Sequence, residues 1–316
     1  MAGLQPLSPT SESSGKKKAS KPDAAIRGRI LWLLIGAARV FACYVNLKSR
    51  ETDDPVHSVL KRSGQFMTSK TTLFTIVLTF AWNSQIAGVV SSYAEPQVVD
   101  RDDGLTIFED EVERADGGTG KILVARIDPE KMTLRVIAGN DPPPADASWS
   151  VTINGSFFDE HGAPLYHLRE GDRVLAPFRR GTNAVFWCRD GRCAIQHSSK
   201  FAVEQTYDLA VQSAPRLMEQ GKPTNGVRGA DVVDGRAGLA IAADGAVLVF
   251  ATTPLSWGGL SFNGLREFLT ASFQSQSILM LDGGNSARLI VQIGELTFSN
   301  GPFSREVPYS IRFTGP

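Results

Sequence analysis

The chain has 316 residues, 42% of them hydrophobic and 21% charged, which is enough apolar material for the core of one large domain or two small ones. Its formal net charge is zero, but residues 1–66 hold 11 basic and 5 acidic side chains, whereas residues 95–316 hold 21 and 28. A mildly acidic body argues against a nucleic-acid groove, so we expect no nucleic-acid partner.

Residues 67–94 have the pattern of a secretory signal peptide. Lys70 precedes an apolar stretch at 73–82, and small residues end the segment at Ala94. We therefore predict cleavage after Ala94 and export, to the periplasm or outside the cell. An uncleaved anchor is the alternative, but polar residues at 83–85 interrupt the apolar run before it reaches the length of a membrane span.

Residues 1–66 do not fit a signal peptide. They begin with a polar arm rich in Ser, Lys and Pro, and their apolar run at 30–45 is interrupted by Arg39 and is shorter than the roughly 20 residues of a spanning helix. Translation from Met67 is one explanation. The other is a membrane-proximal helix, which would be the chain's only contact with a membrane. In both cases we expect residues 95–316 to form the folded domain.

Two of the three cysteines, Cys188 and Cys193, flank Asp190-Gly191, a dipeptide typical of a tight hairpin turn. Cysteines on opposite strands of a hairpin can form a disulfide in an exported protein, and we predict this bond. Two free thiols are the alternative. Two thiols without a His pair at ligand spacing do not favour zinc. We expect no metal site and no cofactor, although a divalent metal is left open.

The domain consists mainly of predicted short strands. Strands at 104–108, 121–127 and 133–137 are predicted to form a β-meander, and one helix is predicted at 262–273, where apolar residues recur on one face. The fold class we expect is α+β, a β-rich mixed-sheet domain with few helices. Further strands are expected at 151–154, 181–188, 194–196, 208–218, 235–242, 246–251, 278–281, 288–291 and 310–313.

A strand that ends in Asn154-Gly155 is followed by two aromatic residues and Asp159. Asn154 can both donate and accept hydrogen bonds, as sugar hydroxyls require, and Asp159 is a possible catalytic carboxylate. The alternative is a hairpin turn at Asn-Gly, with Phe157 or Phe158 in the core.

Arg236 stands among small residues at the start of a strand, a costly place for a guanidinium unless it is paired. It can grip a phosphate with two parallel hydrogen bonds. Alternatively, it can form a structural salt bridge, for example with Asp282.

A buried strand at 278–281 ends in Asp282, two glycines and two small polar residues. Adjacent glycines leave main-chain N–H groups open to an anionic ligand beside Asp282. The alternative is that Asp-Gly is simply a hairpin turn.

In their order and spacing, these motifs resemble the phosphodiester glycosidase family over roughly residues 100–316. The family includes the lysosomal uncovering enzyme, N-acetylglucosamine-1-phosphodiester alpha-N-acetylglucosaminidase, and many exported bacterial proteins. The chain resembles in particular a bacterial branch of uncharacterised function. The motifs are Asn154-Gly155-Ser156-Phe157-Phe158 with Gly162-Ala163-Pro164-Leu165 and Gly171, Gln212-Ser213-Ala214-Pro215-Arg216-Leu217 with Gly221-Lys222, Arg236-Ala237-Gly238-Leu239-Ala240 and Leu281-Asp282-Gly283-Gly284-Asn285-Ser286.

The resemblance implies an enzyme that hydrolyses the bond between the anomeric carbon of a sugar and a phosphodiester, so its partner would be a carbohydrate or glycosyl-phosphodiester substrate. Two departures bear on the sugar: Asn285 stands where the uncovering enzyme commonly has glycine, and Tyr166-His167 replace small residues. The positions that match the family motifs are Asn154, Gly155, Arg236, Asp282, Gly283, Gly284 and Ser286. Ser213 and Asn285 are two further substrate-binding candidates.

The resemblance also suggests a role for each group. Asp282 would be the general base or the nucleophile, and Asp159 is the candidate second carboxylate. Arg236 and the N–H groups of Gly283 and Gly284 would hold the phosphate. A phosphate monoester is a good leaving group, so such an enzyme needs less general-acid help than one acting on an ordinary glycosidic oxygen.

Asn154 and Ser286 would orient the sugar. Ser286 as a hydrolase nucleophile is disfavoured, because the Gly-x-Ser-x-Gly elbow is absent. The histidines His161, His167 and His197 are scattered, and we expect them on the surface or in loops rather than in a metal cluster.

The main alternative is a function of a different class, a non-catalytic envelope protein that binds a phosphodiester-containing polysaccharide through the same cleft. Binding and turnover need the same polar groups, so the sequence does not separate them. A lipid-linked or peptidoglycan-linked sugar phosphate is a third substrate to consider.

Overall fold

The structure is a computed structural model that describes residues 96–139, 141–181, 184–254, 258–303 and 305–316. The predicted signal peptide at 67–94, the segment 1–66 and Cys43 lie outside the described residues, so these predictions stay predictions. Within the described ranges, no helix has the length and apolar character that a membrane span requires.

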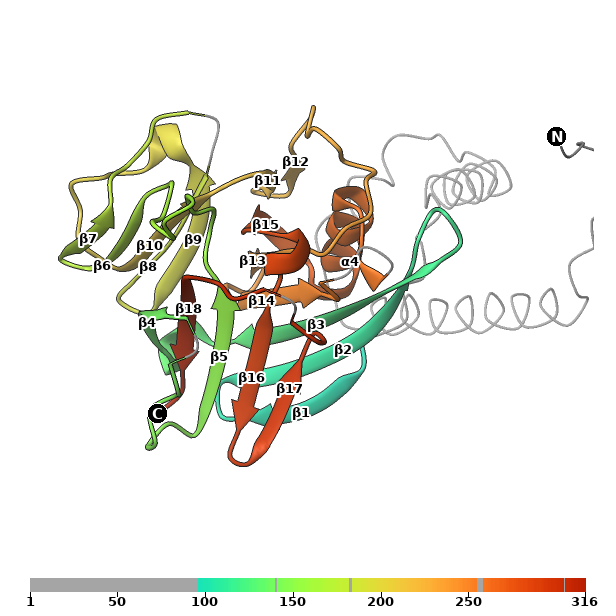
Figure 1. The fold of residues 1–316 in the computed structure, drawn as a ribbon, viewed down its shortest axis with the longest axis horizontal. Coiled ribbons are helices and arrows are strands. Elements are labelled where there is room, and N and C mark those ends of the chain that lie inside the picture. Colours follow the sequence, from blue (N-terminus) through green and yellow to red (C-terminus); the bar gives the residue numbers. More distant parts are fainter. Residues whose placement is uncertain (1–95, 140, 182–183, 255–257, 304) are drawn as a thin grey trace, which may run out of the picture. The chain divides into compact units, whose positions relative to one another are not determined.

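The described strands form three sheets (Figure 1). The largest has eight strands in the order β1-β2-β3-β14-β13-β15-β11-β12. These strands are β1 (Val98–Asp102), β2 (Leu105–Glu113), β3 (Thr119–Ile127), β14 (Val247–Thr252), β13 (Ala237–Ala242), β15 (Ser275–Met280), β11 (Arg216–Glu219) and β12 (Lys222–Pro223).

The other two sheets have five strands each, in the orders β17-β16-β5-β18-β4 and β7-β6-β10-β8-β9. The β-rich α+β class with few helices expected from the sequence is confirmed. Every described strand pair in the three sheets is antiparallel, so the sheets are not mixed as expected. The strands are β17 (Leu296–Ser299), β16 (Leu289–Ile293), β5 (Trp149–Asn154), β18 (Tyr309–Thr314) and β4 (Thr133–Ala138), then β7 (Arg173–Ala176), β6 (Leu168–Gly171), β10 (Tyr207–Ser213), β8 (Ala184–Arg189) and β9 (Arg192–His197).

The predicted helix is confirmed as α4 (Phe262–Phe273), which packs against one face of the eight-stranded sheet. The hydroxyl of Ser261 caps its first turn by accepting a hydrogen bond from the N–H of Gly264 at 3.1 Å. The helix stops at Gln274, whose backbone is left-handed (φ 52°). Its buried side chains form the apolar face expected from the sequence and are Leu265, Phe268, Leu269 and Phe273.

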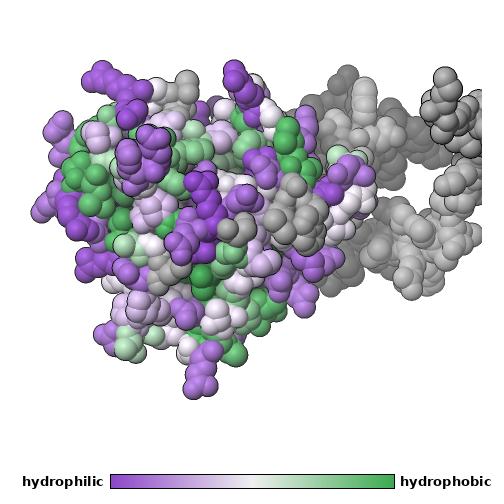
Figure 2. Space-filling view, viewed as in Figure 1, coloured by the Kyte–Doolittle hydropathy of each residue, from purple (hydrophilic) through white to green (hydrophobic). Residues whose placement is uncertain are grey.

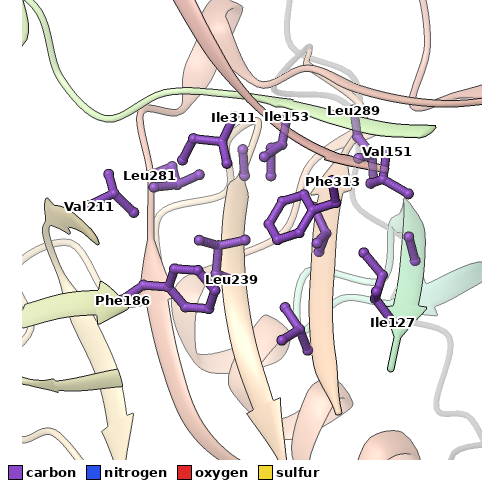
Figure 3. Packing of buried hydrophobic residues seen from close by; sticks show 14 of the residues in the cluster. Ile127, Val151, Ile153, Phe186, Val211, Leu239, Leu281, Leu289, Ile311 and Phe313 are labelled. Carbon is purple, nitrogen blue, oxygen red and sulfur yellow. The ribbon is translucent and has the colours of Figure 1, made fainter. Parts of the chain in front are cut away.

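β15 is largely buried on both faces, as expected from its apolar sequence. Ile278 and Met280 belong to the hydrophobic cluster beneath α4, whereas Leu279 and Leu281 belong to a cluster on the opposite face. The second cluster is the place where the three sheets meet (Figure 3). Its members come from all of them and include Phe186, Val211, Leu239, Ile311 and Phe313.

Two predictions about strand pairing are wrong. β4 does not continue a meander with β3, because β4 pairs with β18 while β3 pairs with β14. The stretch at 208–218 is two strands rather than one, since β10 ends at Ser213 and β11 begins at Arg216 in another sheet. Pro215, which lies between them, has no N–H to donate to a strand ladder.

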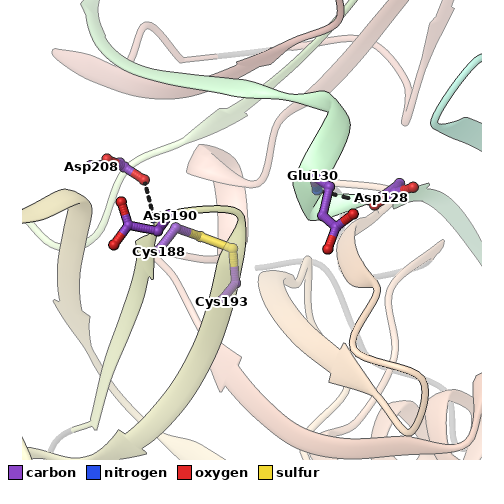
Figure 4. The surroundings of a disulfide bond; sticks show 6 residues. All are labelled: Asp128, Glu130, Cys188, Asp190, Cys193 and Asp208. Carbon is purple, nitrogen blue, oxygen red and sulfur yellow. Dashed lines mark hydrogen bonds between the residues drawn. A yellow bond between two sulfur atoms is a disulfide. The ribbon is translucent and has the colours of Figure 1, made fainter.

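The predicted disulfide is present, with the Sγ atoms of Cys188 and Cys193 2.02 Å apart (Figure 4). The two residues face each other across β8 and β9. The hairpin turns at Asp190 and Gly191, whose φ angles of 51° and 70° are both positive, as a two-residue type I′ turn requires. The N–H of Asp190 donates to the carboxylate of Asp208 at 3.1 Å, which ties the turn to β10.

Candidate active site

Asp282 lies where the chain leaves the eight-stranded sheet at the end of β15 and continues into the second sheet at β16. A short 3-10 helix, η4 (Gly284–Ser286), lies between the two strands. A hairpin would join neighbouring strands of one sheet, so the hairpin-turn alternative for Asp282-Gly283 is wrong. Asp282 is half-buried, its N–H donates to the carbonyl of Gly155 at 3.4 Å, and its carbonyl accepts from Nδ2 of Asn154 at 2.8 Å.

Asn154, the last residue of β5, is 1% exposed and holds the Asp282 loop in place. Its Nδ2 donates to the carbonyls of Gly155 at 3.0 Å and Asp282 at 2.8 Å. Its Oδ1 accepts from the N–H of Arg288 at 3.0 Å. Both amide hydrogens are therefore used within the protein, and these contacts suit a positioning residue rather than a group that binds sugar directly.

Gly155 is a glycine because the ring of Tyr309 lies against it. A Cβ at this position would come within 2.0 Å of the ring, and the N–H of Gly155 donates to the carbonyl of Tyr309 at 3.1 Å. β5 ends at Asn154 and the next strand, β6, belongs to another sheet, so the hairpin-turn alternative at Asn154-Gly155 is wrong as well.

The phenol of Tyr309, which the sequence did not single out, donates to the carbonyl of Ser156 at 3.0 Å. Burial raises the pKa of this phenol, and the nearby charge of Asp282 raises it further, so the Tyr309 hydroxyl stays protonated beside the carboxylate. A single tyrosine far along the chain carried no sequence signal of this role.

The third sheet reaches the same place through Ser213, the last residue of β10. The hydroxyls of Ser156 and Ser213 are 2.8 Å apart, and both residues are buried. The ends of β5, β10 and β15 therefore meet at this junction, one strand from each sheet. Irregular backbone at strand ends is where a rigid scaffold commonly displays reactive groups.

The N–H groups of Gly283 and Gly284 have acceptors within the protein. Gly283 donates to Oδ1 of Asp282 at 3.0 Å, and Gly284 donates to the carbonyl of Gly235 at 2.8 Å. The expectation that they face a phosphate is not met by these contacts. Gly283 allows two loops to approach closely, because a Cβ there would lie 2.8 Å from the Gly235 carbonyl oxygen. Gly284 allows a left-handed backbone, with a φ of 59°.

Arg236 is 9% exposed and binds main-chain carbonyls. Its Nε donates to Leu260 at 3.1 Å and its Nη2 to Val232 at 2.6 Å, while its guanidinium lies 3.8 Å from the centre of the Phe262 ring. Burial lowers the pKa of Arg236, partly offset by the charge of Asp234. Among the described residues it forms no ion pair, so a salt bridge with Asp282 is not found, and its Nη1 makes no hydrogen bond.

Asp159 uses its carboxylate to close its own loop. Its Oδ1 accepts from the N–H groups of His161 and Ala163, both at 2.9 Å. No contact between the described residues joins this carboxylate to the loop of Asp282.

A different carboxylate, Asp234, lies beside that loop. Its two oxygens are 3.8 and 3.9 Å from the position that a Cβ of Gly284 would take, and its Oδ1 accepts from the N–H of Gly235 at 2.8 Å. Sequence reasoning missed Asp234, although the Asp-Gly dipeptide just before Arg236 could have marked a carboxylate at the start of a strand.

The last two residues of the Asp282 motif differ in burial. Asn285 is exposed, whereas Ser286 is only 2% exposed. Neither the Ser286 hydroxyl nor Oδ2 of Asp282 makes a hydrogen bond to a described residue. With the exposed side chain of Asn285, these two groups are available for a ligand.

His167 lies in the loop just before β6, as expected, but it is buried at 1% exposure rather than on the surface. Its Nδ1 lies 2.9 Å from the carbonyl of Ala176, and burial lowers its pKa, which favours the neutral ring. His161 is exposed and His197 is half-buried. Across the described ranges, no three His, Cys, Asp or Glu side chains are grouped to hold a metal ion.

Cavity size alone does not locate the site. A cavity of about 750 Å³ lies beside the disulfide and is lined by residues such as Leu134, Glu170 and Cys188. Of its lining residues, Gly171 alone belongs to the shared motifs. Hydrophilic and hydrophobic residues are also interspersed over the face drawn in Figure 2. The convergence of motif residues at the Asp282 loop is the better guide.

Comparison with known proteins agrees with this geometry. The sequence model of the phosphodiester glycosidase family, NAGPA, matches residues 147–314, which is more than half of the chain and includes both Asn154 at the end of β5 and the Asp282 loop. The chain therefore belongs to the phosphodiester glycosidase family. A search of curated proteins finds no match.

Two solved structures are similar to it. A hypothetical protein from Synechocystis aligns with a TM-score of 0.53 at 13% identity, over 71% of this chain and 64% of that chain, and this likeness shows the fold. The chain thus spans less than two thirds of the Synechocystis protein. The zebrafish N-acetylglucosamine-1-phosphodiester alpha-N-acetylglucosaminidase catalytic domain, auto-inhibited by its pro-peptide, aligns with a TM-score of 0.49 at 14% identity, over 71% of this chain and 87% of that one.

Proposed function

We propose that the chain is an exported hydrolase that cleaves a sugar-1-phosphodiester, with Asp282 as its general base or nucleophile. The observation that carries the proposal is the way this member of the phosphodiester glycosidase family holds Asp282 in place. Its main chain is held on both sides, by Gly155 and Asn154, at the junction of three sheets, while Oδ2 of its carboxylate has no described partner. A carboxylate fixed in this way is oriented before the substrate binds.

The reaction breaks the bond between the anomeric carbon and the phosphate oxygen. As a general base, Asp282 would take a proton from water while the water oxygen attacks the anomeric carbon and the phosphate monoester leaves with the bonding electrons. As a nucleophile, it would form a glycosyl ester that water then hydrolyses. The leaving phosphate carries its own negative charge, so the site chiefly has to hold charge and orient water.

A second carboxylate would assist either route. Asp159 is the candidate from the sequence, but its Oδ1 closes its own loop. Asp234 lies beside Gly284, next to the Asp282 loop, and is the better candidate on contacts. We assign Asp234 this supporting role.

Phosphate binding falls to Arg236, whose Nη1 has no described hydrogen bond. The N–H groups of Gly283 and Gly284 could add to it only if the ligand displaced their present acceptors. Asn154 would act by positioning the Asp282 loop, and Ser286 would contact the substrate directly.

Export is supported by the disulfide, since such bonds persist in oxidising compartments, and by the sequence at 67–94. N-terminal sequencing of the mature protein tests this part. A chain that begins at Glu95 is expected, and a mature chain that retains Trp82 would contradict it.

The test of the activity is release of sugar or phosphate monoester from a panel of sugar-1-phosphodiesters by the chain from Glu95. Asp282→Asn is expected to lower turnover by roughly 10²- to 10⁴-fold without lowering stability. Asp146→Asn, at an exposed residue, is the matched control and should keep full activity. Near-normal turnover by Asp282→Asn would overturn the assignment, and glycan binding without turnover on any substrate would favour a binding protein.

A further inference from the structure

An open cleft of about 370 Å³ lies at the edge of the candidate active site. Most of its walls come from the motif segments and from the start of α4. The residues that line it are Phe157, Leu165, Tyr166, Ala214, Pro215, Val227, Arg228 and Phe262. We call it the apolar cleft.

Main-chain hydrogen bonds connect the apolar cleft to the Asp282 loop. The carbonyl of Pro215 accepts from the N–H of Met280 at 3.0 Å, two residues before Asp282. The carbonyl of Phe157 accepts from Leu165 at 2.9 Å, so two parts of the wall are joined near the end of β5. The cleft and the candidate catalytic carboxylate therefore share the same supporting backbone.

The chemistry of the lining is mainly hydrocarbon. The rings of Phe157 and Tyr166 meet edge to face with centroids 5.9 Å apart. Phe262 is the residue whose ring lies against the guanidinium of Arg236, so it links the cleft to the residue proposed to hold phosphate. A sugar needs partners for its hydroxyls, and this lining offers side-chain polar groups only at Tyr166 and Arg228.

Arg228 is the one charged residue of the lining, and it is exposed. Among the described residues it forms no ion pair or hydrogen bond. The loop that carries it is tied to α4, because Asn263 donates through its N–H to Ala230 at 3.1 Å and through Nδ2 to Asp231 at 2.7 Å. The guanidinium of Arg228 can pair with an anionic group such as a phosphate, while the apolar lining contacts a hydrocarbon group attached to that phosphate.

We propose that the apolar cleft binds the alcohol side of the substrate, and that this alcohol is apolar. The substrate class is then a sugar 1-phosphate esterified to an alkyl or aryl alcohol. Phe157 and Tyr166 contact the hydrocarbon, and Arg228 contacts the phosphate that joins it to the sugar. The proposal rests on the proposed hydrolysis and adds the identity of the leaving phosphate ester.

The first test is a series of sugar-1-phosphodiesters with methyl, butyl and octyl alcohols, on the sugar that gives turnover. In the wild-type chain, kcat/KM is expected to rise roughly two- to fourfold per methylene until the cleft is filled. Tyr166→Ser should flatten this rise, whereas Arg228→Gln should lower kcat/KM about tenfold for every member. Arg192→Gln, at an exposed residue of β9 outside the cleft, is the charge-matched control and should change nothing. A kcat/KM that does not depend on chain length would overturn the proposal.

A binding measurement separates this proposal from the proposed reaction. Octyl phosphate, below its micellar concentration, is expected to bind the wild type and Asp282→Asn equally by calorimetry, and methyl phosphate to bind at least tenfold more weakly. If Arg228→Gln weakens the binding of octyl phosphate but no phosphodiester is turned over, the proposed hydrolase function is overturned and the proposed binding in the apolar cleft stands. Equal binding of octyl and methyl phosphate would overturn the cleft and leave the hydrolase intact.

Discussion

The side-chain amide of Asn154 donates a 2.8 Å hydrogen bond to the main-chain carbonyl of Asp282, a residue 128 positions later in the chain. The same side chain accepts from the N–H of Arg288, on the far side of the loop. One buried amide thus fixes both ends of the segment that carries the proposed catalytic carboxylate. An interaction that orients a catalytic group acts on kcat more than on substrate affinity.

Replacing Asn154 should therefore impair both folding and turnover. In Asn154→Ala the carbonyl of Asp282 and the N–H of Arg288 lose their partner, which should lower the free energy of unfolding by about 2 kcal/mol. At a temperature where the variant stays folded, we expect kcat to fall more than tenfold with little change in KM. Asn225→Ala, at an exposed asparagine, is the control. Unchanged stability and kcat would show that the amide does not hold the loop.

Gly155 should tolerate no side chain. The Cβ of Gly155→Ala would meet the Tyr309 ring at 2.0 Å, so the ring or the strand must shift, and we expect a loss of about 1–3 kcal/mol in denaturant unfolding. Gly264→Ala is the contrasting variant, because its Cβ would meet only the Ser261 hydroxyl at 3.3 Å and alanine favours the helix by up to about 1 kcal/mol. Equal stability of the two variants would contradict the close packing at Gly155.

His167 should make the fold sensitive to acid. Burial lowers its pKa in the folded state below the usual value of 6.5, so below pH 6.5 the unfolded chain binds a proton that the folded chain does not. The contribution of the neutral His167 to the free energy of unfolding is therefore fully present above pH 6.5. It is lost as the pH drops, by up to about 1.4 kcal/mol per pH unit. The measurement is urea unfolding between pH 7 and pH 5. His167→Gln should remove part of this slope, whereas His161→Gln, at an exposed histidine, should leave it intact.

The disulfide should contribute to stability without affecting the chemistry. Closing a loop of this short length is worth about 2 kcal/mol in the chain-entropy model, so the double variant Cys188→Ser with Cys193→Ser should unfold more readily by that amount. Because neither cysteine lies in the Asp282 loop, kcat should stay within about twofold of the wild type. The wild type measured with and without a reductant gives the same comparison. A large fall in kcat would show that the hairpin is coupled to the active site.

The sequence by itself determined the features that local patterns control. The helix at 262–273 followed from the spacing of its apolar residues, and the hairpin with its disulfide followed from Asp190-Gly191 between two cysteines. The buried strand before Asp282 followed from its unbroken apolar run. In each case the determining residues are near neighbours in the chain, so their periodicity or turn chemistry is sufficient.

Only the tertiary structure decided which distant strands pair and what the motif residues contact. It placed β4 beside β18, brought Ser213 to Ser156, and directed the N–H groups of Gly283 and Gly284 to acceptors within the protein. It also placed Asp234 beside the Asp282 loop. These outcomes depend on how three sheets pack around one core, and a hydrogen bond between residues more than a hundred positions apart leaves no local pattern to read.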